Sequence, residues 1–185
     1  MKLETIKLNK TIEEEYRQAL FLLNFIRAIE LKSIRYKLIY ILSLTAILVG
    51  LSVFGSIEYL IGFYIVLIVS WAIFIINYFI KFRKYKQKKA KLKVVAEENF
   101  NQLGDFILEF NQDLIKVTTE KFNSEVKWEY FRAYLEEENT IYILMEQISS
   151  TWSFSKQEIG EDALNKLKQI VKEKLPPLKI KNFNA

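Results

Sequence analysis

Two uncharged stretches decide the fold of this chain: LIYILSLTAILVGLSVFGSI (Leu38–Ile57) and YLIGFYIVLIVSWAIFIINYFI (Tyr59–Ile80). Each holds about 20 residues, the length with which an α-helix crosses a hydrocarbon core of about 30 Å. The link between them is so short that the second helix must return antiparallel beside the first. A buried hairpin in a soluble core is the alternative, but a chain of 185 residues could scarcely enclose it. We therefore predict two transmembrane helices, 38–57 and 59–80.

The charges that flank these stretches predict their orientation. The only charged residue in the connecting turn is Glu58, whereas basic residues gather on the other side of each span. Because positive residues stay on the cytoplasmic side, both termini are expected in the cytosol and the turn outside. The bases before the first span are Arg27, Lys32, Arg35 and Lys37. Those after the second span are Lys81, Arg83, Lys84, Lys86, Lys88, Lys89, Lys91 and Lys93.

The basic juxtamembrane segment 81–93 has two interpretations. It is either a topogenic signal with a solvated, lipid-touching face, or a lipid-sensitive switch that attracts anionic headgroups. Nucleic-acid binding is disfavoured, since the interleaved Phe82 and Tyr85 fit a membrane interface better.

Within the second span, Ser70, Trp71 and Asn77 are the polar or amphipathic exceptions. They either form contacts between helices or subunits, which would permit a homo-oligomer through the hairpin, or are satisfied locally while facing lipid.

Composition removes whole classes of chemistry. The chain has no Cys and no His, which excludes Cys/His zinc sites, Ser-His and Cys-His catalytic pairs, and thiol redox chemistry. Five Gly residues are too few for a Gly-rich nucleotide loop. We therefore expect no catalytic residues, no cofactor and no metal, and a protein that is not an enzyme.

The N-terminal part, 1–37, reads as a strand followed by a helix. Leu3–Leu8 alternates in part, and Thr11 with Glu14 forms a capping box. The helix has no stop signal before the first span, so it is expected to run directly into it. A lone strand has no partner in this part of the chain, and we predict that it joins the C-terminal sheet. The hairpin is then an insertion in one α+β domain.

The C-terminal part, 94–175, reads as an antiparallel sheet closed by a helix. A helix is expected from the capping box of Ser155 and Glu158 through Leu175, with Pro176 ending it and 176–185 as a loose tail. The expected fold class is α+β, with an arrangement similar to that of pleckstrin-like domains. The expected strands are 106–110, 113–119, 126–131, 140–145 and 150–154, with a turn at 136–139.

Three aromatic residues in this part, Trp128, Tyr142 and Trp152, stand at strand spacing. They either form a partner surface or ligand pocket, or belong to the core or sheet surface.

The order of these parts resembles the YcxB-like family of small bacterial membrane proteins. The likeness rests on Trp128 with Phe131, on Ile141-Tyr-Ile-Leu144, and on Phe154-Ser-Lys156. Family members usually carry a Pro-Lys-Arg-x-Phe-like element at this last point, of which the chain keeps only the lysine and an apolar end. The resemblance implies a bacterial inner-membrane hairpin with a cytosolic domain, and it implies no established activity.

Three functions remain open after these exclusions. The first is a non-catalytic inner-membrane protein whose cytosolic domain binds or regulates a protein partner. The second is an immunity protein that neutralises a toxin, and the third is a membrane module that senses anionic lipid.

Overall fold

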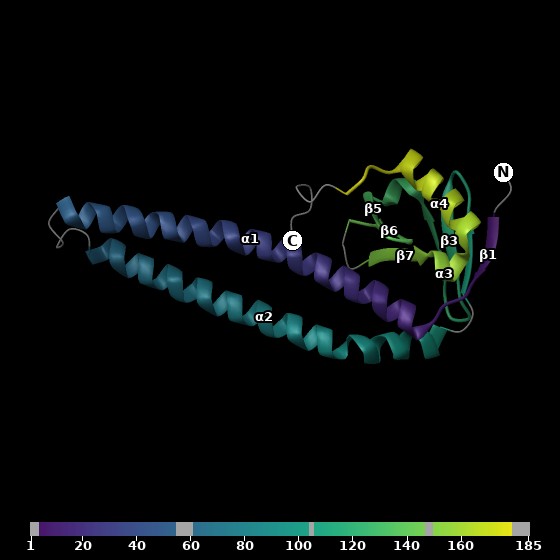
Figure 1. Ribbon diagram of the computed structural model, residues 1–185, viewed down its shortest axis with the longest axis horizontal. Helices are drawn as coiled ribbons and strands as arrows, with labels where there is room; N and C mark the ends of the chain where they lie inside the picture. Colours follow the sequence, from purple (N-terminus) through teal and green to yellow (C-terminus); the bar gives the residue numbers. More distant parts are fainter. Residues whose placement is uncertain (1–3, 55–60, 104–105, 147–149, 179–185) are drawn as a thin grey trace. The chain divides into compact units, whose positions relative to one another are not determined.

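The computed structural model describes residues 4–54, 61–103, 106–146 and 150–178, and it divides the chain into two compact units. Residues 1–22 and 92–184 form an α+β domain, and residues 23–91 form a helical hairpin (Figure 1). The first unit is built from chain segments on both sides of the hairpin, as expected if the hairpin is an insertion. The predicted turn at 55–58, residue Leu3 and the tail beyond 178 lie outside the described residues.

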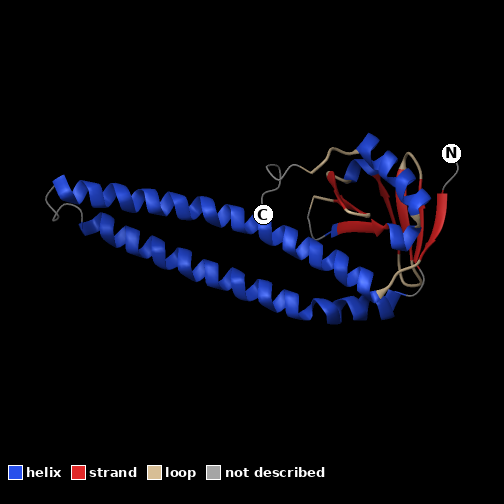
Figure 2. Cartoon of the chain, viewed as in Figure 1, coloured by secondary structure: helices blue, strands red, loops and turns tan. Residues whose placement is uncertain are grey.

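The domain contains two antiparallel sheets, in place of the single sheet that the sequence predicted (Figure 2). The four-stranded sheet has the order β1-β2-β3-β4, and the three-stranded sheet has the order β5-β6-β7. The strands of the first sheet are β1 (Glu4–Leu8), β2 (Phe106–Phe110), β3 (Leu114–Thr118) and β4 (Asn123–Lys127). Those of the second are β5 (Ala133–Glu137), β6 (Thr140–Leu144) and β7 (Thr151–Ser155).

Strand β1 pairs with β2 across the hairpin insertion, which confirms the assembly predicted from the sequence. The register runs from Glu4 opposite Phe110 to Leu8 opposite Phe106. Leu8 enters the main core with an exposed fraction of 5%. The N-terminal strand is therefore an edge of the C-terminal sheet rather than an independent arm.

The switch between the two sheets differs from the prediction of a strand ending near Phe131. Strand β4 ends at Lys127, and Trp128–Tyr130 forms a 3₁₀ turn, η2, which starts a change of direction. The indole N–H of Trp128 donates to the carbonyl of Asn111 at 2.9 Å, which fixes the turn against the β2–β3 connection. Glu136 belongs to β5, so the predicted turn at 136–139 is confined to its second half.

The helix that closes the domain is broken, whereas the sequence predicted one continuous helix. Helix α3 (Lys156–Ile159) and helix α4 (Glu161–Lys174) meet at Gly160, whose φ of 81° lies in the region that favours glycine. The capping box of Ser155 and Glu158 is confirmed at the start of α3. The apolar face of α4, through Leu164, packs into a core shared with strands of both sheets.

All five residues of β6 are buried, because both faces of the three-stranded sheet are covered. Ile141 and Ile143 point into the main core. Tyr142 points to the other face, where its ring stacks on Phe21 with ring centroids 4.7 Å apart. Phe21 belongs to the first turns of α1 (Ile12–Phe54), so the beginning of this long helix is part of the domain.

The hairpin consists of the remainder of α1 and most of α2 (Ile61–Leu103). The two helices run antiparallel, since Asn24 contacts Tyr85 and Thr45 contacts Trp71. Helix α1 continues without interruption into the first apolar stretch, as predicted. The basic segment 81–93 is helical throughout and continues α2.

Candidate functional site

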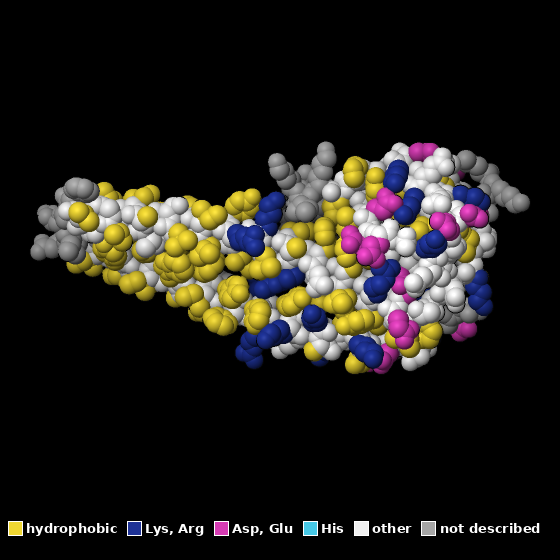
Figure 3. Space-filling model, in the orientation of Figure 1, with side chains coloured by type: hydrophobic (Ala, Val, Ile, Leu, Met, Phe, Trp, Pro, Cys, Tyr) yellow, Lys and Arg dark blue, Asp and Glu magenta, His cyan; other side chains and the backbone are white. Residues whose placement is uncertain are grey.

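The hairpin exposes apolar side chains along the two predicted spans. Both helices are long and apolar enough to cross a membrane, and the most apolar 18-residue windows are 0% and 6% buried. Ile68 is 67% exposed and Val53 is 73% exposed, on opposite helices. Many hydrophobic side chains gather on the visible face of the hairpin, and Lys and Arg side chains are also visible on it (Figure 3). Such a surface suits contact with lipid rather than with water.

The polar groups inside these windows bond to the hairpin itself. Ser70 donates to the carbonyl of Val66 at 2.8 Å, and Asn77 donates to that of Ile73 at 2.9 Å. The indole N–H of Trp71 donates across the hairpin to Thr45 at 3.3 Å. Ser70 and Asn77 are thus satisfied by the preceding turn, while Trp71 links the two helices.

The eight bases of the segment 81–93 lie along α2, and all but the half-buried Lys81 are exposed. The ammonium group of Lys86 lies 4.8 Å from the centre of the Phe82 ring, a cation–π contact. These side chains are spread along about three turns of one helix.

The three aromatic candidates are mostly core residues. Trp128 is 4% exposed and Tyr142 is 0% exposed, so neither contributes to an exposed partner surface. Trp152 is half-buried, and its ring packs edge-on against Phe131 at 5.6 Å. The strand spacing correctly placed Tyr142 in β6 and Trp152 in β7, whereas Trp128 lies in the 3₁₀ turn η2. Phe21, which stacks on Tyr142, is distant in the sequence. The burial of Tyr142 could therefore not be predicted from the residues around it.

A polar cluster lies where α1, β6, β7 and α3 meet, buried except for the Arg17 side chain, and no sequence pattern marked it as a cluster. Its first half is a fork: the guanidinium of Arg17 donates to both carboxylate oxygens of Glu14, at 2.6 and 2.9 Å. Arg17 also donates to the hydroxyl of Thr140 at 2.6 Å. These bonds tie α1 to the start of β6.

The second half of the cluster centres on Gln18. Its amide nitrogen donates to Glu158 at 2.6 Å, and its oxygen accepts from the hydroxyl of Ser153 at 2.6 Å. The same oxygen of Glu158 accepts from the backbone N–H of Ser155 at 2.8 Å. Gln18 therefore bridges α1 to β7 and to the cap of α3. It gave no sequence signal beyond its position one turn after Glu14.

The two carboxylates of this cluster are shifted in opposite directions. The hydrogen bonds from Arg17 hold the pKa of Glu14 below its usual value, against the effect of burial. Burial raises the pKa of Glu158, although Lys10 at 4.0 Å from its second oxygen opposes the shift. Burial likewise raises the pKa of the Tyr142 phenol.

The cluster is therefore a structural link rather than an open site. Glu14, Gln18, Ser155 and Glu158 are all less than 5% exposed, which leaves little room for a substrate. Their hydrogen bonds satisfy helix ends and join elements that are distant in the sequence.

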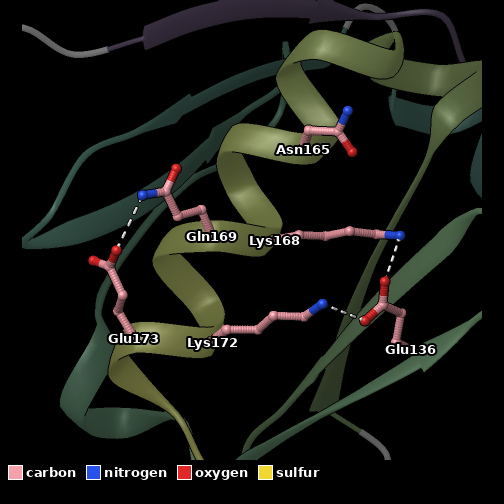
Figure 4. Close-up of a pocket in the computed structure, with 6 residues that line it drawn as sticks. All are labelled: Glu136, Asn165, Lys168, Gln169, Lys172 and Glu173. Carbon is pink, nitrogen blue, oxygen red and sulfur yellow. Dashed lines mark hydrogen bonds and ion pairs between the residues drawn. The ribbon is translucent and has the colours of Figure 1, made fainter.

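A shallow pocket lies on the outer face of α4 (Figure 4). Lys168 and Lys172 both point toward the carboxylate of Glu136 on β5, at 2.6 and 2.9 Å. Gln169 donates to Glu173 at 3.2 Å along the helix. The lysines thus share one carboxylate that fastens α4 to β5, and the pocket presents no convergent set of free polar groups.

Within the described parts of the chain, no group of three or more acidic residues is placed to hold a metal ion. No family model, curated protein or solved structure matches the chain.

Proposed function

We propose that this chain is a non-catalytic protein of the bacterial inner membrane, which crosses the bilayer twice and presents its domain to a protein partner in the cytosol. The observation that carries the membrane placement is the exposed apolar surface of the hairpin, whose two most apolar windows are almost unburied. In water such a surface would be strongly unfavourable, whereas in a bilayer it meets acyl chains.

The polar groups of the hairpin support the same placement. A hydrocarbon core offers no water to bond to, so polar side chains there must find partners within the protein. Ser43, Ser70 and Asn77 all bond to carbonyls of the preceding turn, and Trp71 bonds across the hairpin. The bases that flank both spans favour a cytosolic location for both termini.

The likeness to the YcxB-like family, and to pleckstrin-like domains, belongs to this proposal. A four-stranded and a three-stranded antiparallel sheet with a C-terminal helix in their shared core support it. The motif Ile141–Leu144 forms the doubly covered strand β6. The motif Phe154–Lys156 leads from β7 into the cap of α3.

A surface for the partner is suggested by β4, which lies at an edge of the four-stranded sheet. Two exposed aromatic side chains flank this strand: Phe122, 42% exposed, and Tyr130, 67% exposed. Edge strands add extended segments of other chains through backbone hydrogen bonds, and aromatic residues anchor such contacts. From Val94 onward acidic residues outnumber basic ones, 16 to 11, which favours a basic partner.

Two experiments test the proposal. Membrane placement is tested by extraction and by topology: the chain should resist alkaline extraction, a reporter at Ala185 should be active only in the cytosol, and one at Ser56 only outside. A soluble chain or an external C-terminus would refute it.

The partner surface is tested with a photo-crosslinking amino acid at Tyr130 or Phe122 in native membranes, followed by mass spectrometry. Both positions should capture the same protein, whereas the exposed control position Asn165 on α4 should not. Recovery of only lipid and abundant membrane proteins at all three positions would count against a protein partner.

A further inference from the structure

A small cavity in the hairpin combines a nearly buried arginine with three lysines. It lies between α1 and α2 and has a volume of about 90 Å³, more than a single water molecule requires. Leu23 and Ile26 contribute apolar walls from α1. The charged residues that line it are Arg27, Glu30, Lys81, Lys84 and Lys88.

Arg27 is the centre of this cavity, and its charge is incompletely matched. Its side chain is 10% exposed, and its nearest acidic group is Glu30, with Nη1 and Oε2 3.5 Å apart. That nitrogen is buried and makes no hydrogen bond to any part of the chain that the structure describes. A buried guanidinium N–H without an acceptor is costly, so an acceptor from outside the chain would relieve it.

Aromatic rings hold the guanidinium in place. Its carbon lies 5.3 Å from the centre of the Tyr85 ring and 6.0 Å from that of Phe82. Tyr85 is itself fixed, because its hydroxyl donates to Asn24 at 3.0 Å. The arginine is therefore held in advance of binding, which lowers the entropic cost of accepting a ligand.

The lysines add positive charge from one face of α2. Lys81, Lys84 and Lys88 are spaced by three and four residues, so they lie on the same side of the helix. With Arg27 they place four positive charges around the cavity against the single negative charge of Glu30. A fixed guanidinium fork surrounded by ammonium groups is the arrangement that recognises phosphate.

The position of the cavity along α2 indicates that this phosphate belongs to a lipid headgroup. Lys81 directly follows the uncharged stretch Tyr59–Ile80. At 1.5 Å per residue, Lys84 lies about 6 Å beyond Ile80, the last residue of that stretch. The headgroup layer on each side of a bilayer is about 5–7 Å thick, so the cavity would lie at the depth of lipid phosphates.

We propose that this cavity, formed by Arg27, Lys81, Lys84 and Lys88, binds the phosphate of an anionic phospholipid headgroup. The inference rests on the proposed membrane placement and goes beyond it: it assigns a discrete site to part of the basic segment instead of a diffuse attraction. Arg27, one of the bases that precede the first span, is then the central ligand-binding residue.

The test uses the full-length chain in detergent and measures bound lipid by native mass spectrometry. Phosphatidylglycerol is the anionic probe and phosphatidylcholine the neutral one. Arg27→Gln should weaken phosphatidylglycerol binding about tenfold, and Lys84→Gln, at an exposed position, about threefold. The matched control is Lys89→Gln, which removes the same charge from the same helix outside the cavity, and should stay within about twofold.

Each other outcome overturns the proposal. Equal losses for Lys84→Gln and Lys89→Gln would indicate diffuse charge attraction, and equal binding of both lipids would exclude a site for anionic headgroups. Displacement of the lipid by inorganic phosphate at comparable concentration would identify the free anion as the ligand. If Arg27→Gln does not fold, the comparison of Lys84→Gln with Lys89→Gln still distinguishes a discrete site from diffuse charge attraction. Membrane extraction is scored separately, so failure of the site is distinguishable from failure of the membrane placement.

Discussion

Trp128 and Tyr130 stand in the same 3₁₀ turn, yet they are 4% and 67% exposed. Replacing Trp128 with Ala should therefore lower the free energy of unfolding of the domain by about 3–5 kcal/mol, through lost burial and a remaining cavity. Tyr130→Ala should change it by less than about 0.5 kcal/mol. Thermal proteolysis of the full chain in detergent measures both. A large loss for Tyr130 with none for Trp128 would contradict the observed burial.

The stability of the domain should depend on pH through Glu158, and a variant with a neutral side chain at this position should lack that dependence. Burial raises the pKa of Glu158 above its usual 4.5, so its contribution to stability is present below that pH and is lost as pH rises through the folded pKa. Glu158→Gln cannot ionise and keeps an oxygen to accept from Gln18 or Ser155. The melting temperature of the variant should therefore rise relative to the original protein as pH increases from about 4 to about 7.

Glu14 provides a control, because its pKa is shifted in the opposite direction to that of Glu158. Arg17 lowers the pKa of Glu14, so its contribution is present above pH 4.5 and is lost as pH falls. Glu14→Gln should therefore lose stability relative to the original protein at neutral pH and approach it in acid. Parallel curves for both variants would show that the two carboxylates are not in the environments described.

Single residues also show which features were readable in the sequence. The capping box of Ser155 and Glu158 was predictable, because it depends on residues three apart. The bridge from Gln18 to Glu158 was not, since 140 positions separate them and neither residue type marks a partner. The cavity around Arg27 was equally unreadable, because it depends on how two helices meet.

At the scale of elements, β1 permits a direct test of the assembly. Deleting residues 1–10 removes a strand that pairs with β2 over five residues and contributes Leu8 to the core. The domain beyond the hairpin, 94–175, should lose protease resistance in membranes, because a core-facing edge of β2 becomes open.

A matched pair separates core packing from strand loss. Leu8→Ala should destabilise the domain by about 2–4 kcal/mol, whereas Thr5→Ala, which removes one exposed hydrogen bond to Glu109 from the same strand, should have an effect of about 1 kcal/mol or less. If the deletion leaves proteolysis of 94–175 unchanged, the pairing of β1 with β2 does not support the domain.

Periodicity and length predicted most elements, and the errors fall where the chain changes direction. The helix after Ser155 was expected to be continuous because its apolar spacing survives the break at Gly160. Strand β4 was placed too late, since Trp128 suits a strand by propensity but here enters the core from a 3₁₀ turn. At Trp128 tertiary packing overrode the local preference, whereas at Gly160 the glycine itself adopts the positive φ that ends α3.

At the scale of the whole molecule, the insertion of the hairpin could be predicted from one physical requirement. The lone strand before α1 needed hydrogen-bonding partners, and only the C-terminal sheet offered them. The division into two sheets was not recovered, because nothing in the strand pattern marks which neighbours pair.

The last prediction concerns how the molecule orients in a membrane. Eight bases follow the second span, and they outnumber the four that precede the first. Replacing all eight with Gln should produce a fraction of molecules with an external C-terminus, because this asymmetry retains the flank in the cytosol. Replacing the seven lysines with Arg preserves the charge and should preserve the orientation. Reporter activity at Ala185 measures both variants. An unchanged orientation in the neutral variant would mean that the bases of α2 serve another purpose, such as binding lipid, and that the first span alone sets the topology.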